Sequence, residues 1–270
     1  MRWINESYFM RKMRWFLIYK QFFADWRSVF SFKRLRVNSV HMHGEVELRL
    51  RRKPDAVLWC RAKTTDAAVF WDVFFGKYHL PLTQLPDPAV IFDLGANVGF
   101  TAFDYATRYP ASRIIAVEMD DENAALARRN LKAVSDNCTV EKAAIWYEDG
   151  EISYAKNEEE WGYKADPNLS QKNETALIVR AVTIHTLMQE LGVEWIDFMK
   201  MDIEGAEDKV IYPGAPFLKK LGVLSLEIHA PATYEKVQNI LSAEGFSCQK
   251  SSLHPNSLIA TRSHADTLAN

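Results

Sequence analysis

The sequence predicts an α/β protein whose mostly parallel sheet is covered by helices on both faces. From residue 90 onward, short apolar runs alternate with stretches of helical periodicity. The first run, IFDLGANVGF at residues 91–100, meets an acid at Asp93 and then opens into two glycines, which is typical of a strand, a tight turn and a helix around a nucleotide-shaped ligand. Alternating strands and helices indicate a parallel sheet, and such sheets bind ligands at the carboxyl ends of their strands.

The order of the elements follows from the local patterns. Apolar runs predict strands, and periodic stretches with capping residues predict helices. The expected strands are 89–94, 113–118, 138–146, 151–155, 196–202, 223–229, 246–250 and 257–262. The expected helices are 99–109, 120–134, 183–191, a short one after Gly205, and 232–245. The strands 138–146 and 151–155 flank the turn EDGE, and the polar residues 157–175 are expected to form a loop.

The composition is that of an ordinary globular protein. Apolar residues make up 48% and charged residues 25% of the 270 residues, so the chain can bury a sizeable core in one large domain or two small ones. Its cysteines, Cys60, Cys138 and Cys248, lie far apart and form no C-x-x-C pair. This argues against a disulfide framework or a zinc site and favours a reducing compartment such as the cytoplasm.

The first 40 residues differ from the rest of the chain in charge. They hold nine Lys or Arg and two acids, a net charge of +7 in a chain whose total is −2. Such a basic head indicates an anionic surface partner or a docking arm. Its longest apolar stretch, WFLIY, is too short for a secretory signal, and no stretch of the sequence approaches the length of a transmembrane span.

Aromatic and apolar side chains recur at helical spacing within this basic head. The stripe consists of Trp15, Tyr19, Phe22, Trp26 and Val29, and Phe16, Phe23 and Phe30 widen it. A helix within residues 10–30 is therefore expected, packed on its own domain or on a sister subunit. A peripheral helix on a membrane surface is the alternative.

Residues 40–52 alternate around Gly44 and predict a hairpin. His41 and His43 share one side of it but lack further ligands nearby, so no metal site is expected there. The chain is thus expected to divide into a basic arm at 1–40, a small β and helical subdomain at 41–88, and a ligand-binding domain at 89–265.

The glycine turn differs from a dinucleotide site. A dinucleotide fingerprint reads G-x-G-x-x-G, whereas Asp93-x-Gly95-x-Asn97-x-Gly99 lacks the middle glycine, and no basic residue stands ready for a phosphate. Glu118 ends the next strand, where an acid suits the diol of a ribose. An acid ahead of the glycines suits a cationic amine. S-adenosylmethionine has an ammonium group and a ribose but no phosphate, so the pattern favours it.

Four segments occur in an order known from one enzyme family. They are VIFDLGANVGFTAFDYA, RIIAVEMDDENAALARRNL, FMKMDIEGAEDKVI and VLSLEIH. With FFGKYHLP ahead of them, they resemble the FkbM family of S-adenosylmethionine-dependent methyltransferases over residues 70–261. The resemblance implies a seven-stranded, Rossmann-like class I methyltransferase fold with an antiparallel final strand. It also implies O-methylation of a hydroxyl in a sugar, glycan, glycolipid or natural product.

The resemblance further implies roles in the cofactor site. Asp93, Gly95, Asn97 and Gly99 would shape the methionine side, Glu118 would bind the ribose hydroxyls, and Met119 would lie against the adenine. Ala143, Ala144 and Ile145 would form the adenine slot. The segment KAAIW lacks the acid with which many class I methyltransferases meet the adenine amine, so backbone groups would make that contact.

Polar side chains at two later strand ends are candidates for the chemistry. Period-two alternation places Lys200 and Asp202 on one face of their strand and Glu227 and His229 on one face of theirs. The class I strand order makes these strands neighbours. The expected group beside the transferred methyl is Asp202, Glu204, Glu207, Glu227 and His229.

These side chains offer two ways to activate a hydroxyl, which is a weak nucleophile. His229, supported by Glu227 or Asp202, would remove the acceptor's proton as a base of near-neutral pKa. In the alternative, Asp202, Glu204 and His229 would bind a divalent cation. Metal-free base catalysis is favoured because no ligand spacing is diagnostic. In a purely structural interpretation Lys200 only pairs with an acid.

The polar loop 157–175 contains Trp161 and Tyr163, which could stack on a sugar ring beneath a lid, or could simply anchor a solvated loop. The expected partner is a small-molecule or glycan hydroxyl acceptor and no nucleic acid, with membrane or subunit contacts through residues 10–30. Two other functions remain open. One is a nicotinamide-dependent oxidoreductase on a similar sheet, and the other is a catalytically silent binding module.

Overall fold

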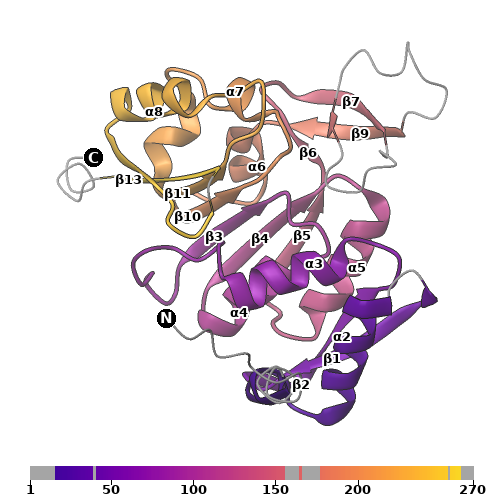
Figure 1. Ribbon diagram of the computed structural model, residues 1–270. Helices are drawn as coiled ribbons and strands as arrows, with labels where there is room; N and C mark the ends of the chain where they lie inside the picture. Colours follow the sequence, from indigo (N-terminus) through magenta and orange to yellow (C-terminus); the bar gives the residue numbers. More distant parts are fainter. Residues whose placement is uncertain (1–15, 39–40, 156–163, 166–176, 255, 263–270) are drawn as a thin grey trace, which may run out of the picture. The chain divides into compact units, whose positions relative to one another are not determined.

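The chain forms two compact units in a computed structural model (Figure 1). The structure describes residues 16–38, 41–155, 164–165, 177–254 and 256–262. The N-terminal unit comprises residues 1–69 and the C-terminal unit residues 70–270. The boundaries suggested by the sequence, at residues 40 and 88, differ from this division and stay a prediction.

The N-terminal unit is built on a helix and a hairpin. Helix α2 (Trp26–Asn38) contacts strand β1 (Glu45–Leu50), which pairs antiparallel with β2 (Lys53–Arg61). The hairpin turns at residues 51–52, so the prediction of a hairpin around Gly44 is wrong. Residues 45–50 are one uninterrupted strand, and Gly44 only precedes it.

The aromatic stripe of the N-terminal unit is not carried by one helix. Residues 16–22 are helical and α2 begins at Trp26, but Phe23 between them forms an isolated bridge with Leu50 at the end of β1. Pairing with a strand takes the backbone out of the helix at this point. The prediction of a single helix within residues 10–30 is therefore wrong for the described part.

The break divides the stripe by exposure. Tyr19, Phe23 and Val29 are buried, whereas Phe16, Trp26 and Phe30 are exposed. A contact of this arm with a membrane or a sister subunit stays a prediction.

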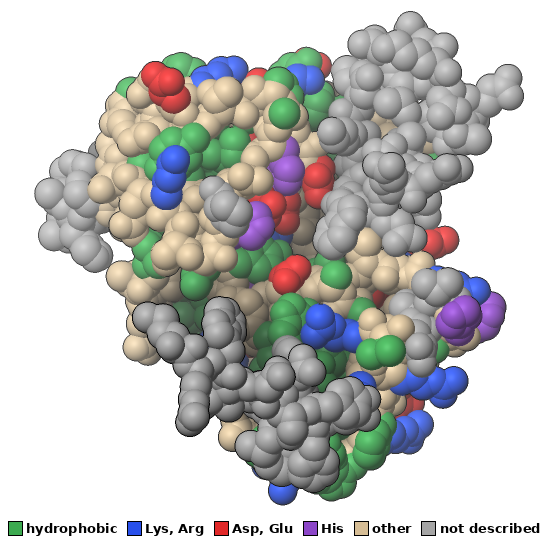
Figure 2. Space-filling view, in the orientation of Figure 1, with side chains coloured by type: hydrophobic (Ala, Val, Ile, Leu, Met, Phe, Trp, Pro, Cys, Tyr) green, Lys and Arg blue, Asp and Glu red, His purple; other side chains and the backbone are tan. Residues whose placement is uncertain are grey.

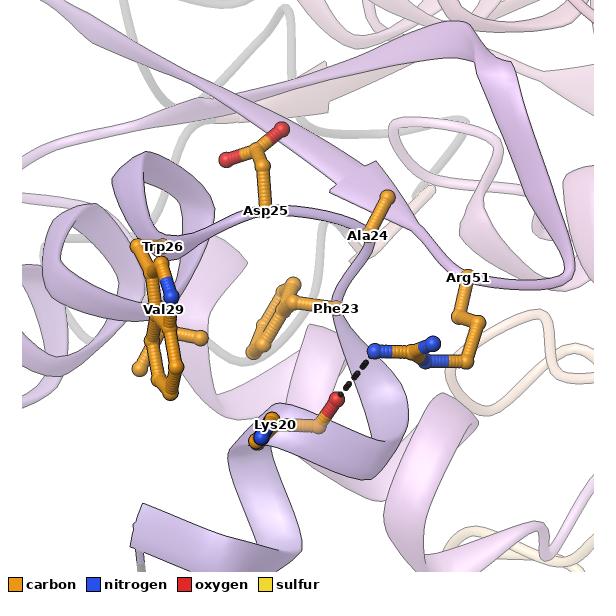
Figure 3. A pocket seen from close by; sticks show the side chains of 7 residues that line it. All are labelled: Lys20, Phe23, Ala24, Asp25, Trp26, Val29 and Arg51. Carbon is orange, nitrogen blue, oxygen red and sulfur yellow. Dashed lines mark hydrogen bonds between the residues drawn. The ribbon is translucent and has the colours of Figure 1, made fainter.

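A small cavity lies at the break (Figure 3). Its volume is about 80 Å³, and it is lined by Lys20, Phe23, Ala24, Asp25, Trp26, Val29 and Arg51. The Arg51 guanidinium donates a hydrogen bond to the Lys20 carbonyl at 2.9 Å. Sites for drug-sized ligands and cofactors occupy roughly 300–1,000 Å³, so this cavity is too small for a nucleotide-like ligand.

A seven-stranded sheet forms the centre of the C-terminal unit (Figure 1). Its order is β12–β13–β11–β10–β3–β4–β5. The strands are β3 (Val90–Leu94), β4 (Arg113–Glu118), β5 (Cys138–Lys142), β10 (Ile196–Met201), β11 (Leu221–Glu227), β12 (Phe246–Lys250) and β13 (Ser257–Arg262). All neighbours pair in parallel except β13, which is antiparallel to both β11 and β12. The predicted parallel sheet with an antiparallel final strand is confirmed.

Helices cover both faces of this sheet. Helices α4 (Phe100–Arg108) and α5 (Asp121–Lys132) contact each other and strands β3 to β5, and they share one face (Figure 1). On the other face, alternate strand residues such as Phe92 and Ile115 join a core with α6 (Ile184–Glu190) and α8 (Tyr234–Ala243). Among the described residues, no helix is both long and apolar enough to cross a membrane.

Short helical segments connect the larger elements. They are α3 (Asp66–Trp71), a π-helical turn (Asp72–Gly76), α7 (Glu207–Val210) and a 3-10 helix (Pro216–Lys220). The segment after the π-helical turn is anchored at His79, whose ring is fully buried and lies 3.1 Å from Asp104 of α4.

A second sheet of four strands follows β5 in the order β6–β9–β7–β8. Its strands are β6 (Ala144–Ile145), β7 (Gly150–Ala155), β8 (Lys164–Ala165) and β9 (Leu177–Val182). The sequence predicted strands on either side of the turn EDGE, but β9 lies between β6 and β7. Strand β9 was not predicted, and β8 lies within the expected loop 157–175, so that prediction is wrong at residues 164–165.

Candidate active site

The glycine loop, residues 95–99, joins β3 to α4 at the carboxyl edge of the sheet. Gly95 and Gly99 have φ angles of 75° and 81°, in the left-handed region that favours glycine. A Cβ on Gly95 would lie 1.8 Å from the carbonyl oxygen of Asp202, which follows β10. The Gly95 N–H donates to the Val117 carbonyl of β4 at 3.0 Å. The loop therefore passes tightly between the ends of β4 and β10, and only glycine fits at position 95.

Lys200 connects this loop to β10. Its ammonium is buried, donates to the Gly95 carbonyl at 3.1 Å, and lies 3.5 Å from Asp93 Oδ1 and 3.4 Å from Asp202 Oδ2. Burial alone would lower the pKa of Lys200, but Asp202 and Asp93 outweigh it and raise that pKa. Lys200 is therefore a charged link between the two strand ends.

Asp93 lies beneath the glycine loop and is fully buried. Its carboxylate accepts a hydrogen bond from the Thr101 hydroxyl at the start of α4 and faces Lys200. The sequence suggested that Asp93 lies near a ligand amine. In this structure the side chain is buried between Thr101 and Lys200, and its place near a ligand amine stays a prediction.

Glu118 closes the loop from the end of β4. Its Oε2 accepts from the Asn97 N–H at 2.8 Å, and its Oε1 accepts from the Asp120 N–H at 2.9 Å. Burial raises the pKa of Glu118 to about 7. Each oxygen of an ionised carboxylate has two lone pairs, so Glu118 could also accept hydrogen bonds from the two hydroxyls of a ribose.

The residues expected around an adenine lie next to Glu118. Met119 is half-buried and follows it directly. Ala143, Ala144 and Ile145 are buried, and the Ala143 N–H donates to the Glu118 carbonyl at 3.2 Å. The structure thus brings the predicted adenine segment to the predicted ribose acid.

Four carboxylates surround His229 just beyond β10 and β11. We call this the His229 cluster; it consists of His229, Asp202, Glu204, Glu207 and Glu227. The Nε2 atom of His229 lies 3.9 Å from Asp202 Oδ1, 3.7 Å from Glu204 Oε2 and 3.6 Å from Glu227 Oε1. Its Nδ1 lies 2.9 Å from Glu207 Oε1. The side chains converge as strand alternation predicted, and histidine and acidic side chains are seen together on the face shown in Figure 2.

The charges around His229 decide what it can do as a base. The hydrogen bond to Glu207, with the nearby carboxylates of Glu204 and Asp202, raises the pKa of His229 to about 9. The imidazole is therefore protonated at neutral pH and has no free site for a further proton. The sequence suggested a near-neutral pKa, whereas in this structure the hydrogen bond to Glu207 and the charges of Glu204 and Asp202 favour the protonated ring.

Two residues beside the His229 cluster were not identified from the sequence. His254 Nε2 lies 3.8 Å from Glu227 Oε1, and the Tyr78 and His254 rings are 5.7 Å apart. His254 stands in an irregular segment with no pattern that could have indicated it. Tyr78 lies in FFGKYHLP, which contributed to the family resemblance and could have pointed to it. Trp161 and Tyr163 lie outside the described residues.

The strand order and the glycine loop define the class of this protein. The sheet has this strand order with one antiparallel final strand, a glycine loop follows β3, and the acid at the end of β4 contacts that loop. This arrangement is that of a class I S-adenosylmethionine-dependent methyltransferase. The sequence profile of the Methyltransferase FkbM domain matches residues 93–249, more than half of the chain. The chain belongs to the FkbM methyltransferase family.

The proteins similar to this chain include one curated relative and two solved structures, as follows. The 2-O-methyltransferase NoeI of Sinorhizobium fredii is 29% identical over 168 residues, which cover 57% of this chain and 68% of NoeI. Precorrin-6y C5,15-methyltransferase from Geobacter metallireducens is 19% identical with a TM-score of 0.41, covering 66% of this chain and 82% of that one. M. jannaschii TYW2 in complex with AdoMet is 12% identical with a TM-score of 0.42, covering 82% and 86%. At such TM-scores the fold assignment rests on the strand order.

Proposed function

We propose that this chain transfers a methyl group from S-adenosylmethionine to a hydroxyl of a sugar, glycan, glycolipid or related natural product. The observation that carries this proposal is the His229 cluster, which stands beside the glycine loop and is joined to it through Lys200. A hydroxyl acceptor must lose its proton to become a good nucleophile, and a dense polar cluster suits that requirement. The relative NoeI, named as a 2-O-methyltransferase, supports an oxygen as the methyl acceptor.

The residues at the glycine loop fit the cofactor by their chemistry. Glu118, held by two backbone N–H groups, would accept the ribose hydroxyls. Met119 and the buried segment 143–145 would provide an apolar setting for the adenine. When bound, S-adenosylmethionine supplies the methyl group, so that a bond from the acceptor oxygen to the methyl carbon forms as the carbon–sulfur bond breaks.

Calorimetry with S-adenosylmethionine or its demethylated product tests the cofactor side. A hydrogen bond to a charged group contributes about 1.5–3 kcal/mol, so Glu118→Ala should weaken binding by roughly 10–100-fold. Glu151→Ala, at an exposed position on β7, is the matched control and should bind as the wild type does. Binding of a nicotinamide dinucleotide in place of S-adenosylmethionine would favour the oxidoreductase alternative.

An acceptor screen tests the reaction class. The full-length chain is incubated with S-adenosylmethionine carrying a labelled methyl group and a panel of sugars, glycolipids and hydroxylated metabolites. The expected product is a methyl ether, identified by mass spectrometry. Methylation only at nitrogen or carbon would contradict the proposed acceptor class, and cofactor binding without transfer to any acceptor of the panel would favour the silent module.

A further inference from the structure

Three ligand atoms of the His229 cluster stand at a separation that suits a shared ion. One atom each from Asp202, Glu227 and His229 lies within 4.8 Å of the others. His229 Nε2 is 3.9 Å from Asp202 Oδ1 and 3.6 Å from Glu227 Oε1. Both distances exceed that of a hydrogen bond. Both are shorter than twice a metal–ligand bond of about 2.1 Å, so one cation can contact both atoms of each pair.

The orientation of His229 matches that of a metal-bound imidazole. Its Nδ1 lies 2.9 Å from Glu207 Oε1, and the Gly205 N–H donates to the same oxygen at 3.2 Å. A carboxylate on one ring nitrogen fixes the tautomer and directs the other nitrogen toward the metal. The other nitrogen here is Nε2, which faces Asp202 and Glu227.

The other carboxylate oxygen of Glu207 also bears on whether a cation binds here. Its side chain is fully buried, and its Oε2 has no hydrogen-bond partner. A buried carboxylate with an unsatisfied oxygen is costly unless a positive charge lies nearby. Lys200 faces Asp202 through Oδ2 and leaves Asp202 Oδ1 to the cluster.

We propose that Asp202 Oδ1, Glu227 Oε1 and His229 Nε2 bind a divalent cation, with Glu207 as the residue that positions His229. Carboxylates with one imidazole suit an ion such as Mn²⁺. Three protein ligands leave coordination positions for an acceptor hydroxyl, whose bound oxygen then releases its proton to water more readily. His229 is thereby a ligand rather than the base. The catalytic part of this inference rests on the proposed function, whereas cation binding itself does not.

Binding of Mn²⁺ alone to the chelator-treated full-length chain tests the site without cofactor or acceptor. Loss of the electron paramagnetic resonance signal of free Mn²⁺ should show one bound ion per chain. Asp202→Asn and Glu227→Gln should abolish binding. Glu207→Gln should weaken it by about 10–100-fold, as expected for a residue that orients a ligand. Glu204→Gln is the matched control, since it removes an acid 3.7 Å from His229 without removing a proposed ligand, and it should retain the bound ion.

Several outcomes would overturn the site. They are no Mn²⁺ binding by the wild type, unchanged binding in both ligand variants, and loss of binding in Glu204→Gln alone. If circular dichroism shows that the variants do not fold, the visible spectrum of Co²⁺ bound to the wild type identifies the ligands instead. Nitrogen and oxygen coordination is expected, whereas a thiolate band would place the ion at a cysteine.

Calorimetry with S-adenosylmethionine on the same samples separates this proposal from the proposed function. Cofactor binding without Mn²⁺ binding overturns the metal site and leaves the function standing. Mn²⁺ binding without cofactor binding overturns the function and leaves the metal site standing.

Discussion

Asp93, Glu118 and His229 show at the residue scale how surroundings decide the task of a titratable group. Asp93 is buried, accepts a hydrogen bond from Thr101 and faces the ammonium of Lys200. Glu118 is also buried, and burial outweighs the two backbone N–H groups that donate to it, so its pKa rises to about 7. His229 has four acids around it and is a cation when nothing else is bound. The residue types alone do not distinguish these cases.

The pKa of Glu118 predicts a pH dependence of cofactor binding. Ribose hydroxyls donate to the ionised carboxylate, and a group with a pKa of about 7 is mostly protonated below that pH. The affinity for S-adenosylmethionine should therefore fall as the pH is lowered through 7, by about tenfold per pH unit at the limit. Calorimetry between mildly acidic and mildly alkaline pH measures this. Glu118→Gln should bind weakly at every pH, and a pH dependence that persists in this variant would assign it to another group.

Among the glycines whose surroundings the structure describes, Gly95 has the least room for an added methyl group. In Gly95→Ala the new Cβ would meet the Asp202 carbonyl at 1.8 Å, at a φ of 75°. Left-handed strain and overpacking together should cost about 2–5 kcal/mol of unfolding free energy, measured by urea denaturation. Gly214→Ala is the control, since Gly214 has a φ of 79° with nothing within 4 Å, and it should cost only about 1–2 kcal/mol. Equal losses in the two variants would show that the contact with Asp202 is unimportant.

At the scale of elements, the carboxyl ends of the strands bring the site together. The glycine loop follows β3, Glu118 ends β4, Asp202 follows β10, and His229 lies two residues beyond β11. Helices pack on both faces of these strands and fix the positions of the strands. The irregular residues that follow each strand are therefore held at the same edge of the sheet. Helix starts contribute as well, since α7 begins at the fully buried Glu207 that holds His229.

Helix α5 offers a test of this dependence on helix starts. The Asp120 carboxylate accepts hydrogen bonds from the Glu122 and Asn123 N–H groups at 3.0 Å each, and the Asp120 N–H donates to Glu118. Asp120→Ala removes the cap and should lower the unfolding free energy by about 1–2 kcal/mol. Asp120→Asn should retain most of the stability, because asparagine caps helices nearly as well. If both variants were equally destabilised, the negative charge rather than the cap would be the stabilising factor.

At the scale of the whole molecule, ligand binding and stability are linked. A ligand that binds only the folded chain, present at about one hundred times its dissociation constant, adds about 2.7 kcal/mol to the unfolding free energy. For a unit of this size that should raise the midpoint of thermal unfolding by roughly 5–10 °C with S-adenosylmethionine. A nicotinamide dinucleotide at the same concentration should give no shift. Equal shifts with both ligands would contradict the assignment of the cofactor.

The sequence by itself determined the main sheet and the family, while the roles of the cofactor-site residues stay predictions. Apolar runs of strand length, helices begun by capping residues and the D-x-G-x-N-x-G turn are local patterns, because period, capping and backbone strain act over a few residues. Strand alternation also foresaw that Asp202, Glu227 and His229 would meet. Predictions from local patterns were wrong where a segment pairs with a strand that is distant in the sequence. Strand β9 lies between β6 and β7 in the second sheet, and the bridge between Phe23 and Leu50 interrupts a predicted helix.

Only the tertiary structure decided the charge state of the site and the roles within it. The pKa of His229 depends on Glu207, which approaches from another element, and on Glu204 and Asp202 at distances that no sequence pattern specifies. The enclosure of Asp93 by Lys200 and Thr101, and the presence of His254 beside Glu227, likewise depend on how separate elements pack. Electrostatic energies vary with burial and with separations of a few ångströms, and folding sets both only when the whole sheet and its helices have come together.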